Sequence, residues 1–259
     1  MVLPAGETGA RPRVSRIGWT PVKGGRHRAQ EAVRLTPDGP HGDRAFCLVD
    51  PVAGRCLRTV ENPALLQTSA SWDGTVLAVE LPAGAVVGEP ERSGDVRKVD
   101  YWGRAAVVEL VDGPWSAAYS RHLGREVVLA ACAAGEVVYG ASVTLVTSGS
   151  LAWLAQRVGA PVDGARFRAT LELDTGDLAP FVEEDWLGRV LRVGTAELRV
   201  SGLVPRCAVI DLDPATGMRD LPLLKALAVD RRNQGEVPFG VYADVTAPGQ
   251  VSKGDAVRA

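Results

Sequence analysis

Two short segments of the sequence combine residue types that hold a phosphate. In Pro21-Val22-Lys23-Gly24-Gly25, two glycines follow the lysine, so the backbone can approach an anion while the amine supplies a positive charge. In Ala165-Arg166-Phe167-Arg168 we expect an extended chain, which places Arg166 and Arg168 on one side as a clamp for phosphate. A hairpin loop and a solvated strand face are the ordinary structural interpretations of these segments, and both stay open.

A third segment, Pro205-Arg206-Cys207, places a thiol directly after a guanidinium. The neighbouring positive charge favours the thiolate, so Cys207 is a candidate nucleophile, sulfur carrier or ligand of a soft metal. A structural cysteine is the alternative.

Ser148-Gly149-Ser150 offers another place for an anion. Apolar residues at helical spacing follow it, which is typical of a helix start capped by a hydroxyl. The same helix end presents free N–H groups and a partial positive charge. The segment therefore predicts either a plain capped helix or an anion site at Ser148 and Ser150.

The sequence contains no nucleophile elbow, Walker loop, dinucleotide fingerprint or HExxH motif. His27, His41 and His122 are scattered, and none has a partner at metal-ligand spacing. We expect them to be solvated or turn histidines rather than catalysts. Nothing in the sequence indicates a Ser-His-Asp hydrolase.

The composition is that of a folded soluble protein. The chain has 259 residues, 46% of them hydrophobic and 23% charged, which excludes disorder as a description of the whole chain. A net charge of −2 disfavours a strongly basic nucleic-acid-binding protein. Only four of the 29 basic residues are lysines. Codon bias explains most of the arginine excess, and a few arginines remain candidates for holding a polyanion.

The sequence predicts a cytoplasmic protein with no membrane partner. The amino terminus lacks the apolar core of a signal peptide, and glycines and a glutamate interrupt the apolar stretch 127–146. The four cysteines form no C-x-x-C pair, which suggests reduced thiols. Cys47 and Cys132 lie in apolar runs and are expected in the core, whereas Cys56 receives no role.

Short runs of branched and aromatic residues, bounded by glycine and proline, predict a strand-rich chain with few helices. Asp73-Gly74 is typical of a two-residue hairpin turn. Helices are expected over 114–123, after Ser150 and over 221–229, and the stretch 127–146 is expected to hold two strands joined by a turn.

In order and spacing, these segments resemble the MOSC family, the domain found at the C-terminus of molybdenum cofactor sulfurases. The N-terminal part resembles the family's companion β-barrel domain, and the resemblance covers about residues 13–258. The sequence segments that carry it are Pro21 to Gly24, Gly42 to Asp50, Arg58 with Asn62-Pro63-Ala64-Leu65, Ser148 to Leu151, Val162 to Arg168, Glu184-Asp185-Trp186, Pro205 to Cys207, Phe239 to Tyr242 and Gly254-Asp255.

The resemblance implies an α+β, mainly β fold, with an N-terminal β-barrel-like domain (1–112) packed on a MOSC-type β-barrel (113–259). It also implies binding of the molybdenum cofactor, a pyranopterin that carries a phosphate and a dithiolene-held metal. In the reductase branch, which is similar to the mitochondrial amidoxime-reducing component, a cysteine thiolate ligates molybdenum. By resemblance, that role falls to Cys207. Lys23, Arg44 and Arg168 match cofactor contacts, and Ser150 matches a serine near the phosphate.

Four further residues complete the candidate binding set: Ser148, Arg166, Thr170 and Arg206. The reductase pattern continues after the second arginine with Pro-Asn, whereas Ala169 and Thr170 follow Arg168 here. Thr170 offers a hydroxyl in place of the amide.

The leading hypothesis is a molybdenum-dependent reductase of N-hydroxylated, or other N- or S-oxygenated, small molecules. Its electrons would come from a separate flavin or iron–sulfur protein. The alternative is sulfur transfer through a Cys207 persulfide supplied by a cysteine desulfurase, without bound molybdenum. A cofactor carrier with no turnover is the third possibility. No nucleic-acid partner is expected.

Overall fold

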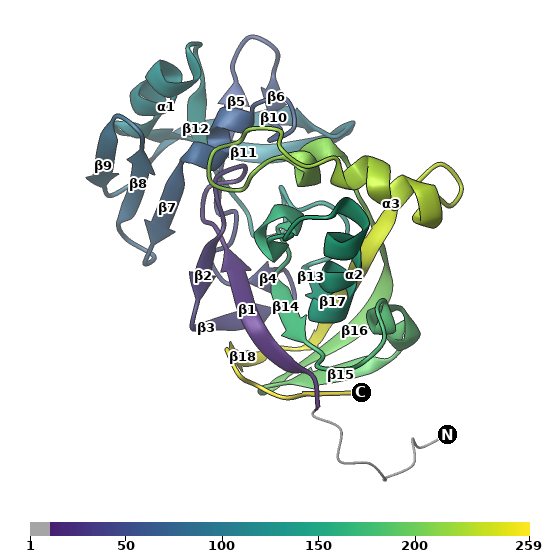
Figure 1. Cartoon of the computed structure of the whole chain (residues 1–259). Coiled ribbons are helices and arrows are strands. Elements are labelled where there is room, and N and C mark those ends of the chain that lie inside the picture. Colours follow the sequence, from purple (N-terminus) through teal and green to yellow (C-terminus); the bar gives the residue numbers. More distant parts are fainter. Residues whose placement is uncertain (1–10) are drawn as a thin grey trace.

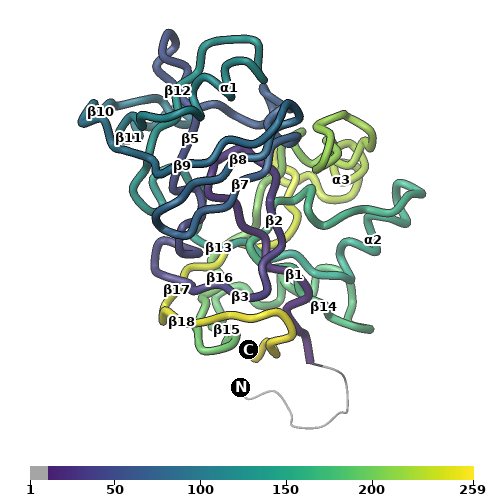
Figure 2. The backbone as a smooth tube through the Cα atoms, turned by 90° about the vertical axis from the view of Figure 1, so that its left-hand side faces the viewer, coloured from purple at the N-terminus to yellow at the C-terminus, as the bar shows by residue number. Residues whose placement is uncertain are grey.

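The computed structural model describes residues 11–259, and over this range the chain is mainly β with three α-helices, as the sequence predicts. A closed barrel forms one end of the molecule and a large sheet the other (Figure 1). The tube view separates the same two parts and places the C-terminus and β1 beside each other in the part with the large sheet (Figure 2).

The closed barrel confirms the N-terminal β-barrel expected from the sequence. Alternate residues of its strands point inward, so Val49, Val108 and Ala130 are buried in its core. Leu48 and Leu129 point to the opposite side and are buried in a second apolar cluster outside the barrel. Its strands in spatial order are β10 (Glu91–Tyr101), β11 (Arg104–Asp112), β12 (Val128–Cys132), β5 (Phe46–Asp50) and β6 (Arg55–Cys56).

Cys47, Cys56 and Cys132 are buried in the wall of this barrel, which confirms the core role expected for Cys47 and Cys132. The Sγ atoms of Cys47 and Cys56 lie 3.6 Å apart. Helix α1 (Trp115–Leu123) covers one side, with Trp115 and Tyr119 buried against the barrel, and it ends at Gly124 in a left-handed cap.

The large sheet has eight strands and includes strands from both ends of the chain. Strand β1 pairs with β14, so the N-terminal segment is part of the same sheet as the C-terminal half. The strands in spatial order are β19 (Val257–Arg258), β15 (Val190–Val193), β16 (Ala196–Pro205), β17 (Pro238–Ala247), β13 (Val143–Thr147), β14 (Leu171–Asp174), β1 (Arg13–Trp19) and β2 (Arg28–Gln30).

Two three-stranded sheets complete the β structure. One pairs β18 with β3, which again joins distant parts of the chain. Strands β1 and β3 lie before residue 112, but they pair with β14 and β18, which lie after it. The domain boundary between residues 112 and 113 therefore stays a prediction. The strands of the two sheets are β18 (Gly249–Ser252), β3 (Ala32–Thr36) and β4 (Gly39–Pro40), and β7 (Ser69–Trp72), β8 (Leu77–Leu81) and β9 (Gly84–Gly88).

Helices α2 (Ser148–Val158) and α3 (Leu223–Arg231) cover one side of the large sheet (Figure 1). Leu154, Leu227 and Phe239 form the apolar layer between them and the sheet. The three α-helices have nine to eleven residues, and none in 11–259 has the length and apolarity of a bilayer-spanning helix. The 3-10 helices are η1 (Pro63–Gln67), η2 (Gly164–Phe167), η3 (Val182–Trp186) and η4 (Ala208–Asp211).

Candidate functional site

A cavity of about 340 Å³ lies where the closed barrel meets the large sheet. Tyr101, at the end of β10, lines it from the barrel, and Thr144 of β13 and Tyr242 of β17 line it from the sheet. The cavity brings together six of the nine site residues predicted from the sequence: Lys23, Arg44, Arg168, Thr170, Arg206 and Cys207.

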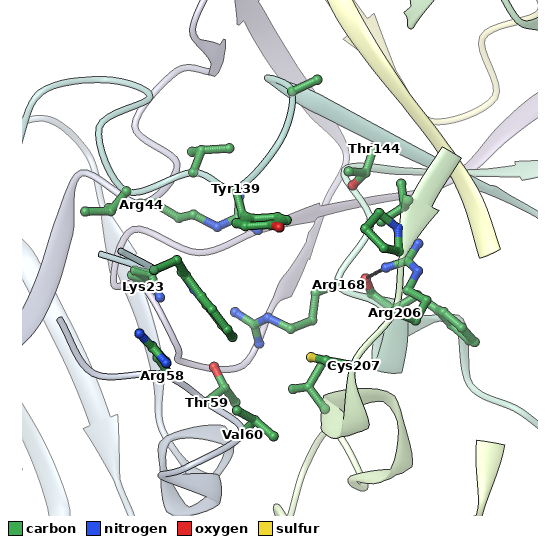
Figure 3. A pocket seen from close by; sticks show the side chains of 18 of the residues that line it. Lys23, Arg44, Arg58, Thr59, Val60, Tyr139, Thr144, Arg168, Arg206 and Cys207 are labelled. Atoms are coloured by element: carbon green, nitrogen blue, oxygen red, sulfur yellow. Dashed lines mark hydrogen bonds between the residues drawn. The ribbon is translucent and has the colours of Figure 1, made fainter. Parts of the chain in front are cut away.

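The cavity is rich in positive charge. Five basic side chains line it, and of the described residues Glu236 is the one carboxylate in the lining. Lys23, Arg44 and Arg58 lie on one side, Arg206 and Cys207 on the other, and Arg168 reaches between them (Figure 3). A concave surface with this charge favours an anionic ligand.

Arg44 and Arg168 both have left-handed backbones, each with φ of 51°. This conformation is uncommon for a residue with a side chain, and such residues gather at functional sites. Each arginine follows a short turn: Asp43 N–H bonds to Pro40, and Arg168 N–H bonds to Ala165. The fold thus keeps two arginines in a less favourable backbone conformation, and the side chains of both line the same cavity.

Buried neighbours hold Arg44 in place. Its guanidinium donates to the carboxylate of Asp43 and, at 3.3 Å, to Nε2 of His27. Asp43 also accepts the Thr20 N–H at 2.9 Å. Burial lowers the pKa of His27 well below its usual value, and Arg168 and Arg44 lower it further. The ring is therefore neutral, and its Nε2 can accept a hydrogen bond from the Arg44 guanidinium.

The prediction of a solvated or turn role is wrong for His27. The side chain is buried, and its Nδ1 has no partner among residues 11–259. The sequence surroundings of His27 are basic and looked solvent-facing, but the loop folds inward beneath β1, where Gly18 leaves room for the ring. His41 is exposed, as expected.

Lys23 follows β1 in the short loop predicted to bind an anion. Its Nζ donates to the Leu57 carbonyl at 3.3 Å and lies 5.0 Å from the centre of the Tyr101 ring. Burial lowers the pKa of Lys23 to about 8, and Arg168 and Arg44 contribute in the same direction. An anion in the cavity would raise this pKa again.

Arg168 and Arg206 each carry an unsatisfied donor. Arg168 Nη1 and Arg206 Nη2 are buried and have no hydrogen-bond partner within 11–259. Burial lowers the pKa of Arg168 to about 9 and that of Arg206 to about 10. Because buried donors are normally paired, these two atoms indicate a missing acceptor.

Arg206 also has a structural role. Its Nε donates to the Phe239 carbonyl and its Nη1 to the Phe167 carbonyl, both at 2.8 Å. The guanidinium lies 5.2 Å from the centre of the Phe167 ring. Arg206 therefore ties β17 to the segment that carries Arg168, and its unpartnered Nη2 lies close to Gly240 of β17.

Thr170 pairs with Thr144 on the neighbouring strand. Each hydroxyl accepts the backbone N–H of the other residue, at 3.1 and 3.2 Å. Both threonines line the cavity, and accepting an N–H leaves each hydroxyl proton free to donate.

Cys207 follows the end of β16 and stands just before η4. Its side chain is exposed, in contrast to the three cysteines of the barrel. Within 11–259 it is the cysteine that lines the cavity, and the half-buried Arg206 precedes it in the chain. The site therefore presents a reachable thiol beside a group of cations.

Arg166 lies outside this lining. The expectation of an extended segment over 165–168 is wrong, because residues 164–167 form η2, which starts at the Asp163 side chain. The helical turn directs Arg166 to Asp220, with two hydrogen bonds of 2.7 and 2.6 Å. Arg166 and Arg168 therefore do not form the clamp that the sequence suggests.

Ser148 and Ser150 also lie outside the lining. Thr147 caps helix α2 by accepting the Ser150 N–H, so the capped helix is observed. The Ser150 hydroxyl donates to the buried Glu183 carboxylate at 2.7 Å, and Thr147 donates to it as well. An anion does sit at this helix start, but it is a side chain of the protein.

The lining residues missed in the candidate set drawn from the sequence include Thr144, Arg58, Trp102 and Tyr139. Arg58 was noted only as part of the family pattern. Trp102-Gly103 occupies a turn where Asn-Gly is usual, and this departure is the signal that identifies Trp102. No local pattern marks Tyr139.

The residues present fit a phosphate-bearing cofactor with a thiophilic metal. Unpartnered donors on Arg168 and Arg206, together with Lys23, offer charge-assisted bonds to phosphate oxygens. Cys207 offers a thiolate to a soft metal, and the volume suits a small organic ligand.

Two sequence families match the chain. Residues 11–108 match the MOSC N-terminal beta barrel domain, and residues 119–258 match the MOSC domain. The molybdenum cofactor sulfurase of Anopheles gambiae is 28% identical over 268 aligned positions, which cover 90% of this chain and 34% of that protein. The molybdenum cofactor sulfurase of Caenorhabditis briggsae is 33% identical over 117 positions, covering 44% of this chain and 16% of that protein. The chain thus spans about a third or less of the length of these relatives.

Two solved structures are similar in part. The YUAD protein from Bacillus subtilis has a TM-score of 0.46 and 13% identity, with 96% of this chain and 94% of that chain covered. YiiM from Geobacillus stearothermophilus has a TM-score of 0.34 and 23% identity, with 45% of this chain and 53% of that chain covered.

Proposed function

The chain belongs to the MOSC family, and from this premise we propose that its cavity binds the molybdenum cofactor and reduces N-hydroxylated small molecules. The observation that carries the proposal is the coincidence of two features in one cavity. Buried donors of Arg168 and Arg206 lack acceptors, and the Cys207 thiol lines the same cavity.

The basic residues hold the anionic part of the ligand. Lys23 and Arg168 neutralise a phosphate, and the hydroxyl protons of Thr144 and Thr170 donate to its oxygens or to a neighbouring polar group. His27 and Asp43 hold the Arg44 side chain, so that less rotamer freedom is lost on binding. Cys207 provides the thiolate ligand of the metal.

When bound, the cofactor supplies the two-electron redox chemistry. The substrate takes up two electrons and two protons, its N–O bond breaks, and the oxygen leaves as water. A separate flavin or iron–sulfur protein delivers the electrons. Cys207 is exposed and lies where the cavity meets solvent, which leaves the site reachable by a small substrate.

Turnover of an N-hydroxylated amidine by purified, molybdenum-containing protein tests this function, with a chemically reduced viologen as electron donor. We expect amidine formation that depends on Cys207 and falls at least about a hundredfold in Cys207→Ser, since the metal loses its protein ligand. Cys132→Ser is the matched control, because that thiol is buried in the barrel wall. Molybdenum-loaded wild type that forms no amidine would overturn the reductase proposal.

Sulfur transfer is the second candidate, and the exposure of Cys207 favours it. The thiolate would attack the persulfide of a desulfurase, take its terminal sulfur and release the donor as a thiol. Intact mass after incubation with a desulfurase and cysteine tests this step. A gain of one sulfur atom that Cys207→Ser abolishes supports it, and no gain in wild type excludes it.

A further inference from the structure

Two aromatic side chains at the cavity are unusually exposed. Trp102 is 42% and Tyr139 57% accessible to solvent, and both line the cavity. Their ring centres lie 5.8 Å apart with the planes at 58°, so the rings form two walls of a corner rather than a stack. Figure 3 shows Tyr139 above Lys23 and Arg168 in the lining of the cavity.

The position of Trp102 in the chain is unfavourable for a tryptophan. Tyr101 pairs with Arg104, so Trp102 and Gly103 make a two-residue hairpin turn, with φ of 56° and 81°. Positive φ at both positions defines the turn that prefers Asn-Gly, and a bulky aromatic is disfavoured there. The ring is also half exposed. The backbone conformation therefore does not favour a tryptophan at position 102, and the side chain gains little from burial there.

Arg58 covers one face of Trp102. Its guanidinium lies 4.2 Å from the ring centre, and its nitrogens reach Asp100 and Glu61 at 3.4 Å. The stacked guanidinium fixes the tilt of the indole, and the carboxylates fix the guanidinium. Trp102 is therefore held in a defined orientation at the cavity, although it is not part of a core.

We propose that Trp102 and Tyr139 form a stacking subsite for a planar aromatic or heteroaromatic ring, whose polar or anionic portion reaches the inner cations. This inference deepens the proposed function and rests on it. Arg58 and the neighbouring ring cover only part of each exposed ring, so the uncovered surface can still gain stacking energy from a ligand. The ring belongs either to the bound cofactor's pterin or to the substrate, and the test separates these two sources.

The variants Trp102→Asn and Tyr139→Ser remove one ring each. Asparagine suits the turn, so we expect Trp102→Asn to melt at the same temperature as wild type or higher, while a structural role predicts a lower one. Tyr139→Phe keeps the ring and should restore the ring-dependent effects that Tyr139→Ser loses. Val107→Ala, on an exposed position of β11 outside the cavity lining, is the matched control.

Two measurements follow on each variant. The first is calorimetric: the dissociation constants of two N-hydroxyamidines, one with a phenyl and one with a cyclohexyl ring, are measured on molybdenum-loaded protein, and their ratio is compared between variants. The other is the pterin content per chain, read by fluorescence after denaturation. A phenyl preference of about tenfold that both ring-removing variants abolish assigns the ring to the substrate. A pterin content lowered severalfold in both variants assigns it to the cofactor.

Variants that match wild type in both measurements would overturn the subsite. The proposed function is tested separately by the metal content of the wild-type protein. Wild-type protein that retains no molybdenum would overturn the proposed function but not the stacking subsite. In that case the subsite is tested on the ligand-free protein with free pterin as the probe. Tighter binding by wild type than by Trp102→Asn then supports the subsite, and equal binding overturns it.

Discussion

Arg166 and Arg168 stand two residues apart, yet the fold gives them opposite surroundings. Arg166 is buried and forms two hydrogen bonds with Asp220, which lower the pKa of that carboxyl. Arg168 is half-buried near Arg44, keeps an unpartnered nitrogen and has a lowered pKa. One arginine stabilises the protein, and the other is held ready for an anion at a cost to stability.

Replacing each arginine by methionine separates the two roles. Arg166→Met is expected to lower the free energy of unfolding by about 1–3 kcal/mol, because a charge-assisted pair is lost. Arg168→Met removes a poorly solvated cation, so the ligand-free protein should be at least as stable as wild type, while it retains at least about tenfold less cofactor. Urea unfolding and pterin content measure both effects. Equal loss of stability in the two variants would contradict this assignment.

The lowered pKa of Lys23, about 8, makes anion binding depend on pH. The amine is charged below pH 8 and neutral above it, so affinity for sulfate should fall by up to about tenfold between pH 7 and pH 9. Sulfate keeps its charge over this range. Calorimetric titration of the ligand-free protein measures the dependence, and Lys23→Met should bind weakly at both pH values. A wild-type affinity that does not change with pH would count against the role of Lys23.

At the scale of elements, the start of α2 shows why a correct local pattern led to a wrong ligand. The sequence predicts a hydroxyl-capped helix with room for an anion, and Thr147, Ser150 and a carboxylate from η3 meet there. Glu183 comes from 33 residues further along the chain, and no local pattern announces it.

Glu183→Gln tests this reading of α2. The amide accepts fewer hydrogen bonds and lacks the charge that suits a helix N-terminus, so the free energy of unfolding should fall by about 1–3 kcal/mol. Cofactor content per folded chain should stay at the wild-type level. If the variant lost cofactor without losing stability, the helix start would belong to the ligand site after all.

Elements with a strong local signal were predicted well. The helix after Pro114 and the strands around 128–132 and 143–147 are observed. The hairpin at Asp73-Gly74 is observed, but the predicted two-residue loop is wrong. Trp72 pairs with Leu77, which leaves four residues in the loop. The Asp73 carboxylate accepts the Thr75 and Val76 N–H groups and thereby stabilises this longer loop. Side chain to backbone bonds of this kind also turned the expected strand at 166 into η2.

At the scale of the whole molecule, the site depends on how two distant parts of the chain meet. Lys23 and Arg44 flank β strands near the start, whereas Arg168 and Cys207 come from the C-terminal half. The sequence motifs and the family resemblance together named six of the lining residues. They did not predict the exposed corner of Trp102 and Tyr139, because that corner exists only where the β10–β11 turn meets the segment before β13.

Molybdenum and pterin content of the purified protein tests the central claim most directly. The protein is produced in a host that makes the cofactor and is supplied with molybdate, and Arg168→Met serves as the comparison. We predict about one molybdenum and one pterin per wild-type chain, with both lowered in the variant, because one proposed ligand would span Cys207 and the unpartnered donors of the cavity's arginines. Wild-type protein free of both molybdenum and pterin would contradict it.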